Sequence, residues 1–298
     1  MPARVELATR HPLAAPVCDF LADLTAAGKS RHTVRGYRGD LAEFAEHHDG
    51  DPAEVTVTVL RGYFTAIGDR APATRARKHA AVAAFLRWCH RHDLIENNPV
   101  DKLDRVKVPE AAPRGVDPER VDAVLAAIPK RNLRDRVLFT LIARTGVRAG
   151  EALGVHVEDL TLTPDDEHVT VHGKGGRSRT VLLDDPALVA LLRRYLRQSG
   201  YTRGPLFRAA KNHIGGPLRY ASAQELWAKY RTVAGEDIEL HQLRHTHATE
   251  LVRDGVSLQT IRKRLGHRKI QTTLLYADHS DQAADDELRA RRRRRASR

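Results

Sequence analysis

The segment His241-Gln242-Leu243-Arg244-His245 is followed along the chain by Leu265-Gly266-His267-Arg268 and then by Tyr276. The spacing of apolar residues around them predicts helices, so these side chains should occupy fixed positions on helical turns. A second arginine precedes them in Thr145-Gly146-Val147-Arg148-Ala149-Gly150-Glu151. Arginines, histidines and a tyrosine in this arrangement are the side chains needed for the attack of a tyrosine on a phosphodiester.

Arg148 and Arg244 suit the binding of a phosphodiester. The negative charge of the phosphate repels nucleophiles, and its pentacoordinate transition state gains further negative charge. Arginine offers a planar fork of donors that stays protonated at physiological pH. We therefore expect the two arginines to contact the non-bridging oxygens, with charge-assisted hydrogen bonds worth about 1.5–3 kcal/mol each.

Tyr276 is the candidate nucleophile, and it requires a base or a strong field. A phenol with a pKa near 10 is ionised in only about one molecule in a thousand at pH 7, a deficit of roughly 4 kcal/mol. His241, His245 and His267 carry imidazoles that exchange protons near neutral pH. Lys174 lies in the glycine-rich turn Gly173-Lys174-Gly175-Gly176, where a mobile ammonium could protonate a leaving 5′ hydroxyl.

In residue type, spacing and order, this set resembles the catalytic residues of the tyrosine site-specific recombinases, the integrase family of phages, integrons and chromosome-dimer resolution. The matching positions over residues 117–280 are Arg148, Lys174, His241, Arg244, His267 and Tyr276. The resemblance implies that the two arginines and His267 contact the scissile phosphate. It also implies that Lys174 protonates the leaving group, His241 does acid–base work and Tyr276 attacks. Glu151 matches the acidic position that supports the active-site arginine.

The N-terminal part of the chain carries apolar residues at helical spacing, which predicts four helices near 13–28, 33–50, 58–67 and 72–92. The pattern from Thr33 to Phe44 resembles the core-binding, SAM-like domain of the same family. On the fourth helix we expect the basic side chains outside the apolar stripe to bind DNA, namely Arg75, Arg77, Lys78 and Arg87.

A proline-rich stretch at 109–116 interrupts the helical pattern and predicts an interdomain linker. We therefore expect a helical domain over 1–108, a catalytic domain over 117–280 and a charged tail over 281–298.

Beyond the linker, β-branched residues alternate on both sides of the glycine-rich turn and predict an antiparallel hairpin. Arg177 and Arg179 on this hairpin are further candidate DNA contacts. The predicted fold class is mainly α, with a small antiparallel sheet inside an α-rich catalytic domain. The resemblance implies that the two domains form a C-shaped clamp around one DNA duplex.

The formal net charge of +12 and a pI near 10.0 favour a polyanionic partner. Charge alone does not decide the matter, because much of it lies in the arginine-rich run at 289–298. Cys18 and Cys89 stand in apolar contexts and are expected to be small core residues, not a disulfide or metal site. No signal peptide or long apolar run is apparent, so we expect a soluble cytoplasmic protein without membrane partners.

These observations predict a DNA strand-exchange enzyme. Tyr276 would form a 3′-phosphotyrosyl link, and the released 5′ hydroxyl would attack the link of a partner strand, giving a Holliday junction. The ester conserves the energy of the broken bond, so neither a metal nor a nucleotide cofactor is expected. The partners would be double-stranded recombination sites and three further protomers in a tetramer, with a second recombinase or a directionality factor left open.

Three other functions remain open at this stage. The same chemistry on a single site would give topoisomerase-like relaxation of DNA. A noncatalytic, sequence-specific DNA-binding protein could use the same helical scaffold. His241 and His245, four positions apart, could also be half of a zinc site completed by His247, His267 or His279, which would suit a metal nuclease.

Overall fold

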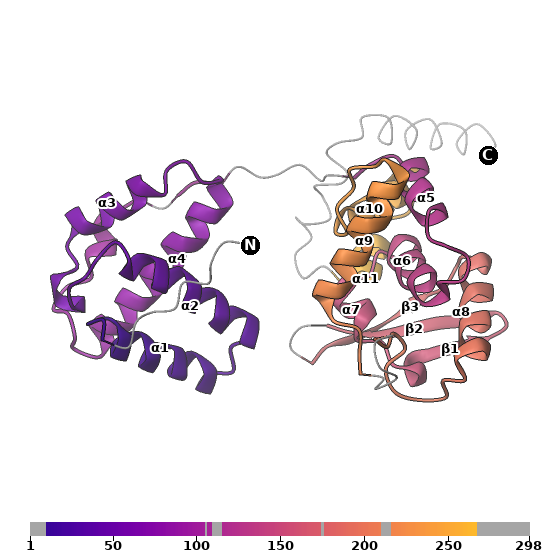
Figure 1. The fold of residues 1–298 in the computed structure, drawn as a ribbon, viewed down its shortest axis with the longest axis horizontal. Coiled ribbons are helices and arrows are strands. Elements are labelled where there is room, and N and C mark those ends of the chain that lie inside the picture. Colours follow the sequence, from indigo (N-terminus) through magenta and orange to yellow (C-terminus); the bar gives the residue numbers. More distant parts are fainter. Residues whose placement is uncertain (1–9, 105, 109–114, 174–175, 210–215, 267–298) are drawn as a thin grey trace, which may run out of the picture. The chain divides into compact units, whose positions relative to one another are not determined.

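The computed structural model describes residues 10–104, 106–108, 115–173, 176–209 and 216–266. The chain divides into two compact units, Met1–Ala111 and Ala112–Arg298 (Figure 1). This division falls within the proline-rich stretch.

The N-terminal unit is built from four α-helices and two short 3₁₀ segments among its described residues. They are α1 (Ala14–Ala26), α2 (Arg31–Ala45), η1 (Pro52–Glu54), α3 (Val57–Ala66), α4 (Pro72–Arg91) and η2 (Pro99–Lys102). Local sequence sets where several begin. The Ser30 hydroxyl accepts the backbone N–H of Thr33 at the start of α2, and Pro72 occupies the first turn of α4. The four predicted helices are thereby confirmed.

Aromatic side chains fill the centre of this unit. Phe20 on α1 lies edge-on to Phe85 of α4, with ring centroids 5.7 Å apart, and Phe44 packs against Tyr63 at 5.1 Å. The indole N–H of Trp88 donates to a carboxylate oxygen of Asp23 at 2.7 Å, which ties α4 to α1. The ring pairs bury large apolar areas, and the bond to Asp23 satisfies the one polar atom of the indole.

Lys78 does not lie on the surface of α4, which corrects the sequence prediction that its ammonium is available to DNA. The residue is 3% exposed. Its ammonium donates to Asp40 at 3.1 Å and to Glu43 at 2.7 Å, both on α2. Arg77 also pairs with Asp40 but keeps an exposed side chain. The carboxylates of α2 therefore draw Lys78 inward, because a buried charge must be paired.

Replacing Lys78 by alanine should lower the free energy of unfolding of the N-terminal unit by about 3–5 kcal/mol, because two carboxylates lose a buried partner. Urea unfolding followed by Trp88 fluorescence in a Trp227→Phe background measures this effect. The matched control is Arg87→Ala, an exposed position on the same helix, expected to change stability by less than about 0.5 kcal/mol. Equal effects of the two substitutions would contradict the assignment.

The C-terminal unit is α-rich, with one small sheet among its described residues. Its helices are α5 (Pro118–Ala126), α6 (Leu133–Thr145), α7 (Ala149–Leu153), η3 (Val157–Asp159), α8 (Pro186–Ser199), α9 (Tyr220–Ala234), α10 (Gln242–Arg253) and α11 (Leu258–Leu265). The strands are β1 (Leu160–Thr163), β2 (Asp166–His172) and β3 (Ser178–Leu182), in the order β1-β2-β3 and all antiparallel. This confirms the predicted fold class. The β2–β3 hairpin agrees with the sequence prediction, whereas β1 was not predicted.

Helix α6 is central to this unit and packs against α8 and α10 (Figure 1). Val137, Leu138, Phe139 and Leu141 are fully buried along it. It ends at Gly146, whose φ of +65° is open to glycine at little cost. A Cβ at this position would lie 2.6 Å from the His247 ring, so α10 passes close to the turn that leads into α7.

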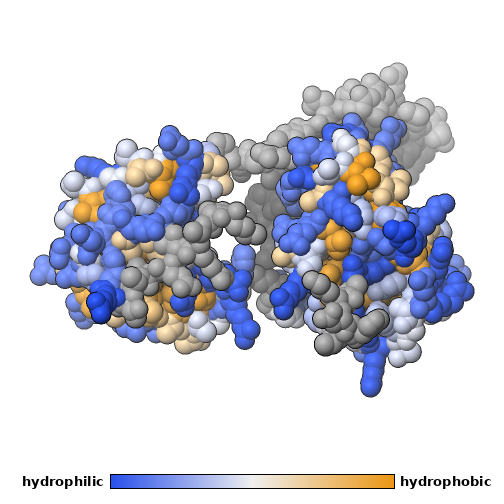
Figure 2. Space-filling model, viewed as in Figure 1, coloured by the Kyte–Doolittle hydropathy of each residue, from blue (hydrophilic) through white to orange (hydrophobic). Residues whose placement is uncertain are grey.

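Hydrophilic residues cover most of the visible face of each unit, with smaller apolar areas between them (Figure 2). None of the described helices combines the length and apolarity needed to cross a bilayer.

Candidate active site

Glu151 is fixed at the start of α7 by the residue that precedes the helix. Its Oε2 accepts the backbone N–H of Arg148 at 2.9 Å, and its Oε1 accepts Nη1 of the same residue at 2.9 Å. An acidic residue at the third helical position that reaches back to the N-cap is a recurrent helix start. The side chain of Arg148 remains 52% exposed. Hydrogen bonds to Glu151 therefore fix the backbone of Arg148 while its guanidinium stays exposed to solvent.

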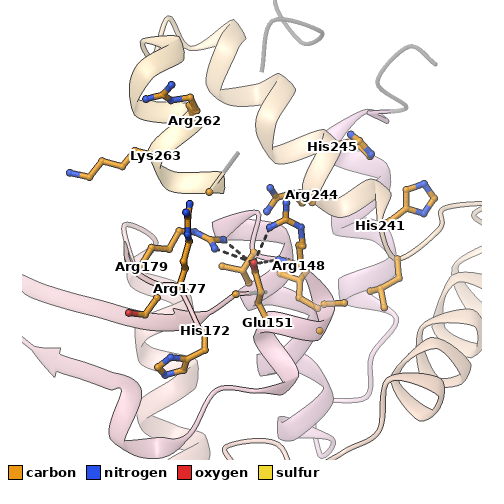
Figure 3. A pocket seen from close by; sticks show the side chains of 18 of the residues that line it. Arg148, Glu151, His172, Arg177, Arg179, His241, Arg244, His245, Arg262 and Lys263 are labelled. Carbon is orange, nitrogen blue, oxygen red and sulfur yellow. Dashed lines mark hydrogen bonds and ion pairs between the residues drawn. The ribbon is translucent and has the colours of Figure 1, made fainter. Parts of the chain in front are cut away.

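Arg179 of β3 holds the same carboxylate from the opposite side (Figure 3). Its Nη1 and Nη2 donate to Oε1 and Oε2 of Glu151 at 3.1 and 2.9 Å. Burial raises the pKa of Glu151, but hydrogen bonds from Arg179 and from the Arg148 backbone outweigh burial and lower that pKa to about 2. Glu151 is thus ionised at any physiological pH.

Arg244 of α10 is a buried arginine oriented by backbone carbonyls. Its Nη1 donates to the carbonyl of Gly146 at 2.7 Å, and its Nη2 donates to the carbonyl of Leu265 at 2.8 Å. The residue is 9% exposed. Both acceptors lie at helix C-termini, where carbonyls lack helical partners and the helix dipole is negative. Arg244 and Arg148 line one pocket.

Two histidines stand at the start of α10 beside Arg244. The rings of His241 and His245 lie 5.7 Å apart and nearly perpendicular. Burial, then the neighbouring His241 and Arg244, lower the pKa of His245. At neutral pH this favours an uncharged His245 imidazole, which can accept or relay a proton.

The pocket is an open cavity of about 1420 Å³ lined mainly by cationic and polar side chains. Arg262 and Lys263 come from α11, whereas His172 and Arg177 come from the β2–β3 hairpin (Figure 3). Tyr220 lines it from the first residue of α9 and is 47% exposed. Such a surface is suited to a polyanion.

The structure brings four predicted catalytic or supporting residues into this pocket: Arg148, Glu151, His241 and Arg244. Lys174, His267 and Tyr276 lie outside the described residues, as does His279. Gly173 and Gly266, which directly precede Lys174 and His267, line the pocket. Arg177 and Arg179 also line it, while Arg75, Arg77, Lys78 and Arg87 belong to α4 in the other unit.

The sequence predictions do not include two basic residues of α11, Arg262 and Lys263, which line the pocket. Arg262 and Lys263 sit between the buried Ile261 and Leu265, so the helical pattern contained the signal that they face away from the core. The predictions also do not include the contacts of Arg264. That side chain reaches carbonyls of Arg144 and Leu182, which no periodicity indicates.

No group of three or more His, Cys, Asp or Glu side chains suited to a metal ion occurs within the described ranges. His247, one of the residues considered for a zinc site, is buried and its Nε2 accepts Nε of Arg264 at 3.1 Å. Burial, then the charge of Arg264, lower its pKa to about 3. His247 is therefore a neutral acceptor that anchors α11 to α10.

Because the folded pKa of His247 lies below its usual 6.5, the unfolded chain binds this proton more readily. The contribution of His247 to stability is thus complete above about pH 6.5 and is lost as pH falls towards 3, by about 1.4 kcal/mol per pH unit. His247→Gln keeps an acceptor oxygen and should remove about 1–2 kcal/mol of the stability change between pH 6.5 and 5.

Urea unfolding of wild type and His247→Gln across this pH range measures the difference, with the exposed His156→Gln as control. Parallel pH profiles for wild type and His247→Gln would show that the buried imidazole is not the group responsible.

Two family models match the chain. The phage integrase family matches residues 114–283, and the phage integrase N-terminal SAM-like domain matches residues 17–93. Tyrosine recombinase XerC of Rhodospirillum centenum is 35% identical over 273 residues, covering 84% of this chain and 78% of that protein.

Among solved structures, XerH site-specific recombinase bound to palindromic difH substrate in a post-cleavage complex superposes with a TM-score of 0.71. That match has 21% identity and covers 95% of this chain and 90% of that one. A lambda integrase tetramer bound to a Holliday junction gives a TM-score of 0.72 at 17% identity, over 86% of this chain and 77% of that one. At these identities the likeness concerns the fold.

Proposed function

We propose that the pocket lined by Arg148, His241 and Arg244 is the active site of a DNA recombinase. The chain belongs to the phage integrase family and is thus a tyrosine recombinase, which cleaves and rejoins DNA in site-specific recombination. One observation carries this proposal. The two arginines stand far apart in the sequence, one directly before α7 and the other on α10, yet they line the same cavity beside His241.

Arg148 and Arg244 bind the non-bridging oxygens of the scissile phosphate. The half-exposed side chain of Arg148 and the carbonyl-oriented guanidinium of Arg244 support this role. Preorganised donors of this kind need no rearrangement as charge develops in the transition state. Glu151 holds Arg148 at its base, and His241 serves in acid–base transfer.

Tyr276 attacks the phosphorus, and the bond from phosphorus to the 5′ oxygen breaks. Lys174 gives its proton to that oxygen, and His267 contributes to holding the phosphate. These roles rest on the matched family motifs. The pocket positions of Gly173 and Gly266, the residues directly before Lys174 and His267, support them. The 3′-phosphotyrosyl ester conserves the bond energy, so the 5′ hydroxyl of a partner strand can displace the tyrosine without a metal or nucleotide.

Both parts of the chain bind DNA: the helical domain at 1–108 and the catalytic domain at 117–280, which the linker at 109–116 joins. Exposed Arg87 and Arg77 of α4, with Arg75, contact the backbone from the first domain. Arg177, Arg262 and Lys263 do so from the second, because their cationic side chains line the pocket and attract phosphates.

Strand exchange takes place in a tetramer on two synapsed sites through a Holliday junction, in the cytoplasm where the chromosome lies. The fold shared with the lambda integrase tetramer bound to a Holliday junction supports this assembly. A second recombinase or a directionality factor would act on the same complex.

A covalent adduct tests the proposal and identifies the site. Purified protein is incubated in EDTA with sheared host DNA and stopped with SDS, and the DNA that remains attached is sequenced. Tyr276→Phe should bind the same DNA and form no adduct, because it lacks the nucleophilic oxygen. An adduct with the variant would exclude Tyr276 as nucleophile. Sequence-specific binding by wild type without an adduct would instead indicate a noncatalytic DNA-binding protein.

Lys174→Ala should slow cleavage of the recovered site by about 100-fold or more, the usual contribution of a general acid. A 5′-bridging phosphorothiolate at the scissile position has a better leaving group that needs no proton, so it should restore the rate of Lys174→Ala to near that of wild type. Single-turnover cleavage of both substrates measures this rescue. Equal deficits on the two substrates would assign the acid to another residue.

A further inference from the structure

Arg179 is held by acceptors on two other elements. Its Nη1 and Nη2 reach the carboxylate of Glu151, and its Nε donates to the carbonyl of Arg264 at 2.8 Å. Its side chain is 16% exposed. Three of its five N–H donors, one on each guanidinium nitrogen, are thus engaged by protein acceptors.

The guanidinium also packs against the end of α11. A Cβ built on Gly266 would lie 2.9 Å from Nη1 and 3.1 Å from Cζ of Arg179. The close approach is possible only because glycine has no side chain. The φ of Gly266, +67°, also favours glycine at this position. Arg179 thus joins β3 to the start of α7 and to the last residue before His267.

The charges of this group explain why a second arginine is needed. Glu151 is ionised and its Oε1 lies 2.9 Å from Nη1 of Arg148. Paired with Arg148 alone, the carboxylate would cancel the charge that a phosphate requires, because the attraction at this distance is strong in a partly buried site. Arg179 donates to both carboxylate oxygens, so the three side chains carry a net charge of about +1.

Exposure separates the two arginines. The side chain of Arg148 is 52% exposed, whereas that of Arg179, on the other side of Glu151 in Figure 3, also lines the pocket but is only 16% exposed. We propose that Arg179 is a positioning residue for DNA cleavage, not a DNA contact. It takes up the charge of Glu151, leaving Arg148 available to the scissile phosphate, and it fixes the end of α11. The inference rests on the proposed recombinase activity and replaces the sequence prediction that Arg179 binds DNA.

A double-mutant cycle tests this role on the DNA site recovered from the covalent adduct. Four proteins are compared: wild type, Arg179→Gln, Glu151→Gln and the double variant. Arg179→Gln should lower the single-turnover cleavage rate by about 100-fold or more, because the unbalanced carboxylate neutralises Arg148 in the transition state. The Kd for the same DNA should change by less than about threefold, since Arg179 does not touch the duplex.

In the Glu151→Gln background there is no carboxylate charge to balance. There the same Arg179→Gln substitution should cost at most about tenfold in rate, which reveals the coupling between the two side chains. Arg179→Lys keeps the charge and should recover part of the rate. A matched control is Arg193→Gln, which breaks another arginine–glutamate pair, with Glu167 at 3.3 Å, away from the pocket.

Equal rate losses from Arg179→Gln in both backgrounds, or a loss in Kd as large as the loss in rate, would overturn the inference and make Arg179 a DNA contact. If Arg179→Gln alone does not fold, the cleavage rates of Glu151→Gln and the double variant are compared, because neither protein carries the unbalanced carboxylate. A difference well above about tenfold between them would then assign Arg179 a direct contact with DNA. Absence of an adduct with wild type would refute the proposed function itself, and the positioning role with it.

Discussion

The buried carboxylate of Glu151 holds the start of α7 against strand β3. Glu151 accepts hydrogen bonds from the backbone and side chain of Arg148 and from both terminal nitrogens of Arg179. Removing a carboxylate from water is costly, and only several charge-assisted donors offset that cost. The start of α7 and strand β3 must therefore meet at this point. The arginines of this group line the pocket, so its electrostatic potential is positive and attracts a phosphate.

Helix C-termini supply the second constraint, and arginines satisfy it repeatedly. Arg244 donates to the carbonyl of Gly146, which follows α6, and to the carbonyl of Leu265, the last residue of α11. Arg264 donates to the carbonyl of Arg144 near the end of α6. The last carbonyls of a helix lack intrahelical partners and lie at its negative end, so cations are favoured there. The helix ends that surround the pocket are thus connected through guanidinium groups, and Arg244 gains an orientation fixed by backbone atoms.

The N-terminal unit uses charge differently. There Lys78 lies among the carboxylates of α2, and the neighbouring Arg77 shares one of them while remaining exposed. The same helix thereby contributes one cation to the interior and others to the surface. Aromatic pairs such as Phe20 with Phe85 supply the apolar part of the packing.

The sequence by itself determined the fold class, the four N-terminal helices, the hairpin and the set of side chains suited to phosphodiester chemistry, because helical spacing, capping residues and reactive groups are local properties. It could not separate Lys78 from Arg77, or Arg179 from Arg177, since adjacent basic residues look alike until their partners are known. Strand β1 was also missed: Leu160 to Thr163 alternate apolar and polar side chains, but four residues are a short signal, and the strand is completed by its pairing with β2. Only the tertiary structure decided which cations keep an exposed side chain and which are buried against Asp40, Glu43 or Glu151, because burial and pairing are set by residues distant in the chain.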